Sequence, residues 1–117
     1  MRRRVVVTGL GCISPLGKNV QETWEALLAG KSGAGPITLF DASQHKTRFA
    51  CEVKNFDAAA LLGGREARRM DRFTQFAVAS TLQAVEQAGL TVDDSNRDRI
   101  GVIIGTGIGG IGTLLEQ

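Results

Sequence analysis

Residues 4–10, Arg-Val-Val-Val-Thr-Gly-Leu, form the stretch that decides the fold class. Four consecutive β-branched residues at 5–8, closed by Gly9 and Gly11, predict a buried strand. A second apolar run at 100–105, Ile-Gly-Val-Ile-Ile-Gly, predicts another strand of the same kind. Two such strands separated by helical segments favour an α/β fold with a mainly parallel sheet.

Capping signals mark a first helix between the two strands. Asn19 lies three residues before Glu22, a spacing similar to a capping box, and Gly30 suits the left-handed position just beyond a helix end. These signals predict a helix through Leu28. The chain between the helices is turn-rich, and in it we expect a short strand at 49–53 and a helical turn at 57–62. A last helix is expected to begin at Thr113.

The strongest helix signal covers residues 65–88, which contain neither glycine nor proline. Gly89 follows at the position where a left-handed glycine often ends a helix. The second half of this segment is apolar most of the way round, which is typical of a buried helix. We therefore predict one continuous core helix over 65–88.

Charge and cysteine usage limit the classes of function. A net charge of +2 is too small to predict nucleic-acid binding, and the apolar run after the N-terminal arginines ends at Thr8, which argues against a secretory signal. No stretch approaches the roughly 20 apolar residues that span a bilayer. Cys12 and Cys51 could pair, but we expect them to be reduced in a cytoplasmic protein.

Candidate catalytic residues are few. The single histidine, His45, lies in a polar stretch, and Cys12 and Cys51 have no evident base beside them, so both are expected to be small buried hydrophobes. The spacings typical of zinc sites, such as C-x-x-C and H-x-x-x-H, are absent from the sequence, so we expect no metal. The residues of this chain alone do not make a complete catalytic apparatus.

A glycine-rich turn follows the second predicted strand. Gly105, Gly107 and Gly110 satisfy the G-x-G-x-x-G pattern of dinucleotide-binding units. The pattern here follows the second strand rather than the first, and the confirming acidic residue would lie beyond Gln117. A close-packed turn lining another kind of pocket is the preferred interpretation, with nucleotide binding as the alternative.

Four arginines are the most informative charges. On a continuous helix they share one face over two turns, and Glu66 and Asp71 point away from that face. Like charges grouped near a helix N-terminus repel each other and oppose the helix dipole, so the pattern indicates an acidic partner. The alternative is an ordinary solvated helix end. The four residues are Arg65, Arg68, Arg69 and Arg72.

Five segments, in this order and spacing, resemble the β-ketoacyl-acyl-carrier-protein synthase II family: RRVVVTGLGCISPLG, ETWEALLAGKSG, ITLFDAS, REARRMDRFTQFAVAS and IGVIIGTGIGG. The resemblance implies a thiolase-like fold, a five-layered α/β/α/β/α sandwich, of which residues 1–117 are an incomplete N-terminal segment without an internal boundary. It implies a homodimer that condenses an acyl-enzyme with malonyl-acyl-carrier protein, releasing CO2, without a cofactor. The nucleophilic cysteine and two histidines are expected downstream of Gln117, so the isolated chain is expected to be inactive.

The resemblance also gives roles to residues of this chain. Arg65, Arg68 and Arg69 match the docking site for the acidic acyl carrier protein, and Arg72 carries over less directly from the same face. Gly107 and Ile108 match the turn beside the acyl pocket, where the isoleucine limits chain length. A non-catalytic partner of the same fold, similar to a chain-length factor, is the alternative in which the downstream cysteine is missing.

Overall fold

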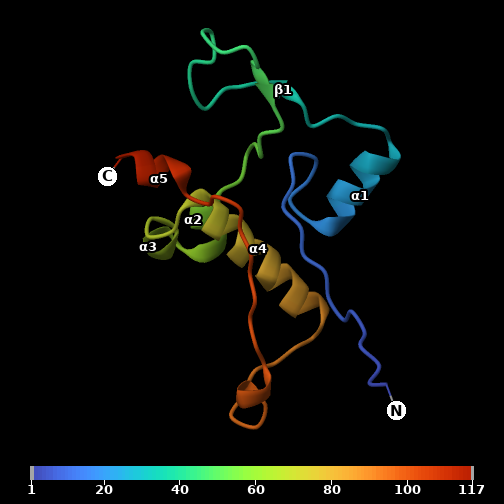
Figure 1. The fold of residues 1–117 in the computed structure, drawn as a ribbon. Coiled ribbons are helices and arrows are strands. Elements are labelled where there is room, and N and C mark those ends of the chain that lie inside the picture. The colour runs from blue at the N-terminus through green and yellow to red at the C-terminus, as the bar shows by residue number, and fades with distance from the viewer. Residues whose placement is uncertain (1, 117) are drawn as a thin grey trace. The chain divides into compact units, whose positions relative to one another are not determined.

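The computed structural model describes residues 2–116 (Figure 1). Residues 12–56 form one compact unit, and the remaining described residues, 2–11 and 57–116, form the other. Whether the chain forms part of one domain without an internal boundary stays a prediction. The elements in chain order are α1 (Val20–Leu28), β1 (Gly35–Pro36), β2 (Phe49–Ala50), α2 (Ala58–Leu62), α3 (Gly64–Ala67), α4 (Arg72–Gln87), a 3-10 turn (Arg97–Arg99) and α5 (Ile111–Glu116).

Helix α1 has the ends that its local sequence predicts. The Asn19 side chain accepts a hydrogen bond from the Glu22 amide at 2.8 Å, and the Glu22 carboxylate accepts one from the Lys18 amide at 2.8 Å. Gly30 adopts the left-handed conformation, with φ of 64°. Its amide and that of the next residue donate to carbonyls of the last turn, a Schellman motif. The predicted limits of this helix are confirmed.

Two predictions around the hairpin and α2 differ in outcome. Strand β2 pairs with β1 in antiparallel register, Gly35 opposite Ala50 and Pro36 opposite Phe49, so the predicted strand at 49–53 is present only at its first two residues. The helical turn expected at 57–62 is confirmed as α2. Its N-cap is Asp57, whose carboxylate accepts a hydrogen bond from the Ala60 amide at 3.0 Å.

The prediction of one continuous helix over 65–88 is wrong. Helix α3 ends at Ala67 and α4 begins at Arg72, with an extended backbone at Asp71 (φ −62°, ψ 157°). The side-chain amide of Gln75 donates to the Ala67 carbonyl at 2.9 Å and to the Met70 carbonyl at 3.2 Å, so it adds hydrogen bonds to carbonyls on either side of the break. The predicted end at Gly89 is confirmed, with φ of 59°.

The segments 4–10 and 100–105 are not paired strands, contrary to the prediction. Figure 1 draws both without arrows, and β1–β2 is the only ladder of two strands within residues 2–116. Both segments are strongly exposed: Val5 is 91% and Ile103 99% accessible. A strand needs a neighbour for its amides and carbonyls, and residues 2–116 provide none for these two.

Close backbone contact joins the first of these segments to α4. A β-carbon on Gly9 would overlap with the Ala84 carbonyl, and one on Gly11 would overlap with the Ser80 carbonyl. Alternate residues of an extended chain face the same side, and the two carbonyls are one helical turn apart, so the two glycines fit consecutive turns of the helix. The amide of Leu10 also donates to the Gln87 side chain at 2.6 Å.

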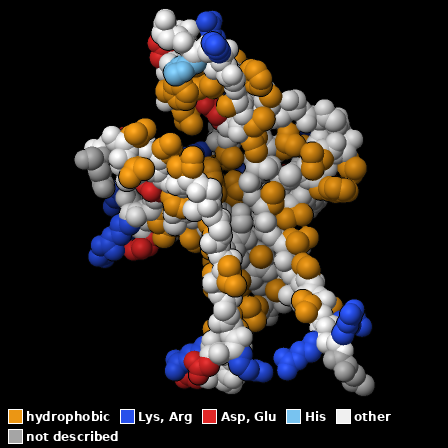
Figure 2. Space-filling model, in the orientation of Figure 1, with side chains coloured by type: hydrophobic (Ala, Val, Ile, Leu, Met, Phe, Trp, Pro, Cys, Tyr) orange, Lys and Arg blue, Asp and Glu red, His pale blue; other side chains and the backbone are white. Residues whose placement is uncertain are grey.

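Helix α4 is far less buried than predicted. Among the described residues the buried hydrophobic side chains are all alanines, and on α4 only Ala79 is fully buried. Phe73 and Leu82 are 39% and 48% exposed. Figure 2 shows hydrophobic side chains over much of the visible surface. Thr8, Gly9, the second half of α4 and residues 100–104 line an open groove of about 350 Å³.

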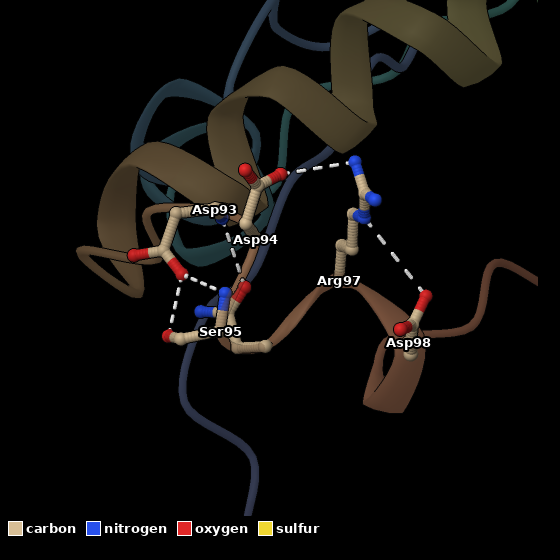
Figure 3. Close-up of polar contacts among 6 residues, drawn as sticks. Asp93, Asp94, Ser95, Arg97 and Asp98 are labelled. Atoms are coloured by element: carbon tan, nitrogen blue, oxygen red, sulfur yellow. Dashed lines mark hydrogen bonds and ion pairs between the residues drawn. The ribbon is translucent and has the colours of Figure 1, made fainter.

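A polar turn connects α4 to the second extended segment (Figure 3). The Asp93 carboxylate accepts hydrogen bonds from the Ser95 hydroxyl at 2.5 Å and the Ser95 amide at 2.8 Å, which lower the pKa of Asp93. Arg97 lies between two carboxylates, 2.9 Å from Asp94 and 4.0 Å from Asp98. These contacts are local and exposed, and they fix the shape of the turn.

Candidate functional site

The arginines predicted to form a docking face are all exposed, but they do not lie on one helix. Arg65 belongs to α3, Arg68 is its C-cap, Arg69 follows in the break, and Arg72 is the first residue of α4. The helical projection that grouped them is therefore wrong in its geometry, because the backbone changes direction at Asp71. We call these four residues the basic surface.

The break also changes the electrostatic argument for the basic surface. Arg68 and Arg69 follow the end of α3, where cations are tolerated, and only Arg72 stands at the start of a longer helix. Glu66 does not point away from the surface as predicted, because it lies 3.9 Å from Arg69 in an exposed ion pair. Such a pair contributes little, so the surface remains predominantly cationic.

Aromatic packing orients the arginine on α4. The Arg72 guanidinium lies over the Phe76 ring, 4.9 Å from its centroid. A cation above an aromatic face is favourable, and the contact restricts where this long side chain extends. This stacked geometry was not expected from the sequence, although the spacing of four residues on a helix permits it.

The glycine-rich turn lies against the start of α4. Gly109 has φ of 65°, and a β-carbon on it would come 3.0 Å from the Phe73 ring. A β-carbon on Gly110 would overlap with the Asp71 carboxylate. The prediction of a close-packed turn is confirmed for Gly109 and Gly110. A β-carbon on Gly107 would have no atom of the described residues within 4 Å apart from its chain neighbours, and Ile108 is 76% exposed.

The same carboxylate forms a bond to the helix that follows the turn. The Thr113 hydroxyl, on α5, donates to Asp71 Oδ1 at 2.5 Å. The start of α4 and the turn at 109–113 are therefore linked by a hydrogen bond and by two backbone contacts. A carboxylate at this position opposes an anionic pyrophosphate, which argues against the dinucleotide alternative.

The cysteines and the histidine show no catalytic arrangement within residues 2–116. Cys12 is half-buried, with its sulfur 3.7 Å from the Thr23 hydroxyl, whereas Cys51 is exposed, contrary to the prediction of a buried residue. Neither cysteine forms a disulfide bond within residues 2–116. The His45 ring makes an edge contact with Phe40 at 5.7 Å between centroids. The described part of the chain contains no group of three residues suited to hold a metal ion.

Two carboxylates with structural roles were missed by the sequence analysis. Asp71 was considered only as a charge beside the arginines, although aspartate before a helical segment is a common N-cap signal. Glu52 accepts hydrogen bonds from the Thr38 amide at 2.9 Å, the Thr38 hydroxyl at 2.6 Å and the Leu39 amide at 3.3 Å. The bonds from Thr38 lower the pKa of Glu52. No short-range motif indicates either long-range contact.

Comparison with known proteins identifies the class. The sequence profile of the N-terminal domain of β-ketoacyl synthases matches residues 2–117. The solved structure described as the ishigamide ketosynthase/chain length factor superposes on all of this chain and 30% of its own, with a TM-score of 0.75 and 41% identity. The chain therefore belongs to the β-ketoacyl synthase family, and its fold is that of the N-terminal part of these thiolase-like enzymes.

Within the family, two similar curated proteins share one name. A 3-oxoacyl-[acyl-carrier-protein] synthase 2 from Synechocystis is 53% identical over 99% of this chain and 28% of its own length. The protein of that name from Coxiella burnetii is 54% identical over 94% of this chain and 27% of its own length. The chain thus spans little more than a quarter of these relatives. Within residues 2–116, no helix is long and apolar enough to cross a membrane.

Proposed function

We propose that this chain is the N-terminal part of a fatty-acid condensing enzyme. The enzyme joins an acyl group held on a cysteine to malonyl-acyl-carrier protein, with loss of CO2, to give 3-oxoacyl-carrier protein. The observation that carries the proposal is the 53% identity to a 3-oxoacyl-[acyl-carrier-protein] synthase 2 over 99% of the chain. The nucleophilic cysteine and two histidines would come from the remainder of a full-length enzyme, not from Cys12, Cys51 or His45.

The basic surface supplies the docking site for the carrier protein in this proposal. Arg65, Arg68 and Arg69 are exposed, and Arg72 extends the cationic surface onto α4. Exposed charges of one sign steer an oppositely charged partner and fix its orientation more than they raise raw affinity. An acidic carrier protein delivering a thioester needs that kind of encounter, because it must bind, transfer its acyl group and leave.

The turn at Gly107 and Ile108 supplies part of the acyl pocket. The exposed Ile108 offers an apolar side chain to a hydrocarbon, and open space beside Gly107 leaves room for it. The preferred chain length then depends on where this turn holds the isoleucine. We further propose a cytoplasmic homodimer that uses no cofactor and no metal, and that takes acyl and malonyl thioesters.

A second candidate is a non-catalytic subunit of the same fold. It is favoured by the name of the similar solved structure, which pairs a ketosynthase with a chain length factor. Such a subunit would keep the basic surface and the pocket turn but would lack the nucleophilic cysteine. The two candidates differ in one chemical property, the ability to form an acyl-enzyme.

The test uses a synthase of full family length whose N-terminal region is residues 2–117, called the full-length synthase below. It is incubated with acyl-carrier protein and then with malonyl-carrier protein, and acyl-enzyme, CO2 and 3-oxoacyl product are measured. A condensing enzyme forms all three. A folded protein that never becomes acylated supports the chain-length-factor candidate, and one that binds no carrier protein contradicts both.

A further inference from the structure

Two segments far apart in the sequence meet at Asp71. Asp71 lies in the break between α3 and α4. The hydroxyl of Thr113, 42 residues further on, donates a hydrogen bond to Asp71 Oδ1. The bond joins the start of α4 to the start of α5. Residues 105–110, which include the proposed pocket turn, lie directly before this contact.

Backbone packing adds to the hydrogen bond. The other Asp71 oxygen occupies the space that a β-carbon of Gly110 would need, and the Phe73 ring comes to 3.0 Å from the position that a β-carbon of Gly109 would take. Gly109 also has a left-handed backbone, which glycine adopts without strain. Two residues at the start of α4 therefore hold three residues of the turn and the helix that follows it.

The Asp71 side chain is committed to this contact and not to capping. Asp71 occupies the N-cap position of α4, where an aspartate usually accepts a hydrogen bond from an amide of the first turn, but its side chain makes no capping bond. Instead the carboxylate turns towards Thr113 and Gly110. Helix α4 therefore lacks a common capping hydrogen bond, and the carboxylate instead holds the turn before α5.

Ile108 depends on this anchor for its position. It directly precedes Gly109, and its own side chain is 76% exposed, so packing of that side chain does little to fix it. We infer that Asp71 is a positioning residue: through Thr113 and Gly110 it holds the turn at Gly107 and Ile108, and thereby sets the discrimination between acyl chain lengths. This inference rests on the proposed function of the turn.

Two substitutions at Thr113 separate the role of its hydroxyl from that of its methyl group. In the full-length synthase, Thr113→Val removes the hydroxyl and keeps the shape, whereas Thr113→Ser keeps the hydroxyl. The readout is the ratio of kcat/KM between the preferred acyl chain and one that is two carbons longer. We expect Thr113→Val to lower this ratio by about fourfold, which corresponds to the burial of one methylene in the pocket. Thr113→Ser should keep the ratio of the unmodified enzyme.

Two further variants separate positioning from general stability. Asp71→Ala should lower the ratio at least as much as Thr113→Val does, because it removes the contact with Gly110 as well as the hydrogen bond. The double variant should lower the ratio no further than Asp71→Ala alone. Thr91→Val is the matched control: Thr91 is exposed, and its hydroxyl makes no hydrogen bond within the described residues. This control should leave the ratio unchanged.

Two results would contradict the inference about Asp71, and a third would contradict the proposed function. If Thr113→Val changes kcat/KM by the same factor for every chain length, or changes none of them, Asp71 does not position the turn. If Thr113→Ser behaves like Thr113→Val, the hydroxyl is not the link and the inference fails. If the unmodified full-length synthase does not condense at all, the proposed function is wrong, and this result is seen before any variant is made.

Discussion

Gly9 lies so close to the main-chain carbonyl of Ala84 that a β-carbon on residue 9 would overlap with the oxygen. Gly11 has the same relationship with the next turn of α4 towards its N-terminus, at Ser80. The two glycines allow an extended chain to lie directly on a helix. From the sequence, the two glycines indicated only the end of a strand.

This contact predicts a sharp difference between two glycine substitutions. Gly9→Ala in the full-length synthase should lower stability by about 1–3 kcal/mol, because the chain must move away from the helix. Gly101→Ala is the matched control, since among residues 2–116, apart from its own chain neighbours, no atom lies within 4 Å of a β-carbon at that position. Thermal melts of the two variants check the prediction. An equal fall in Tm for both would mean that the close approach at Ala84 does not matter.

The limits of helices could be predicted from the sequence because their causes are local. Asn19 with Glu22, Gly30 and Gly89 each act within one turn of the helix end that they mark. The break at Asp71 could not be predicted in the same way. The break is stabilised by a hydrogen bond from the Gln75 side chain to the Ala67 carbonyl and by one from Thr113, 42 residues after Asp71. No short window of sequence contains both donors.

The predictions of paired strands and of a buried helix were wrong for a related reason. Residues 100–105 have the composition of a buried strand, but a strand exists only when a neighbour accepts its hydrogen bonds, and composition does not say where that neighbour is. The same distinction between local and long-range causes applies to the candidate site. The arginines were identified by their charge, whereas their arrangement depends on a backbone break that their spacing does not reveal.

The isolated 117-residue chain is expected to be molten or to aggregate. Ile103 is 99% exposed, Leu115 is 79% exposed, and the buried hydrophobic side chains of the described residues are all alanines. Exposed apolar surface of this extent binds hydrophobic dyes and prevents cooperative unfolding. Dye fluorescence and a thermal melt of the purified chain measure both properties. A sharp two-state melt of a monomer would contradict the expectation.

Ile108→Phe in the full-length synthase should shorten the acyl chain that is accepted. The larger ring takes space that methylenes would otherwise fill, and each excluded methylene loses about 0.8 kcal/mol of burial, or about fourfold in kcat/KM. Turnover of a short acyl substrate by the same variant is the control and should be retained. Undiminished turnover of long chains would show that Ile108 does not line the pocket.

Acidification should release the carboxylate contact between Glu52 and residues 38–39. The hydrogen bonds from Thr38 favour the ionised carboxylate and lower its pKa in the folded protein. A lowered pKa stabilises the fold above the pKa of the unfolded chain, and this contribution is lost as the pH falls through the lowered pKa of the folded state. The amide protection factors of Thr38 and Leu39 should therefore fall in that range. Unchanged protection once the Glu52 carboxyl is protonated would contradict this assignment.

The central claim about this segment is that its arginines dock a carrier protein and take no part in the chemistry. The decisive measurement compares kcat/KM for carrier-bound acyl substrate with that for a small pantetheine thioester, in the full-length synthase carrying Arg68→Glu and Arg69→Glu. Reversal of Lys31 and Lys46, two exposed cations outside the basic surface, is the control with the same change in net charge.

For the reversed Arg68 and Arg69, we predict a loss of about fivefold per arginine with the carrier-bound substrate. The loss should appear mainly in the association rate and should be largest at low salt, because screening weakens the attraction that reversal removes. The small thioester should react at the unmodified rate, and the Lys31 and Lys46 control should behave normally with both substrates. An equal loss with both substrates would make the arginines structural and contradict the claim.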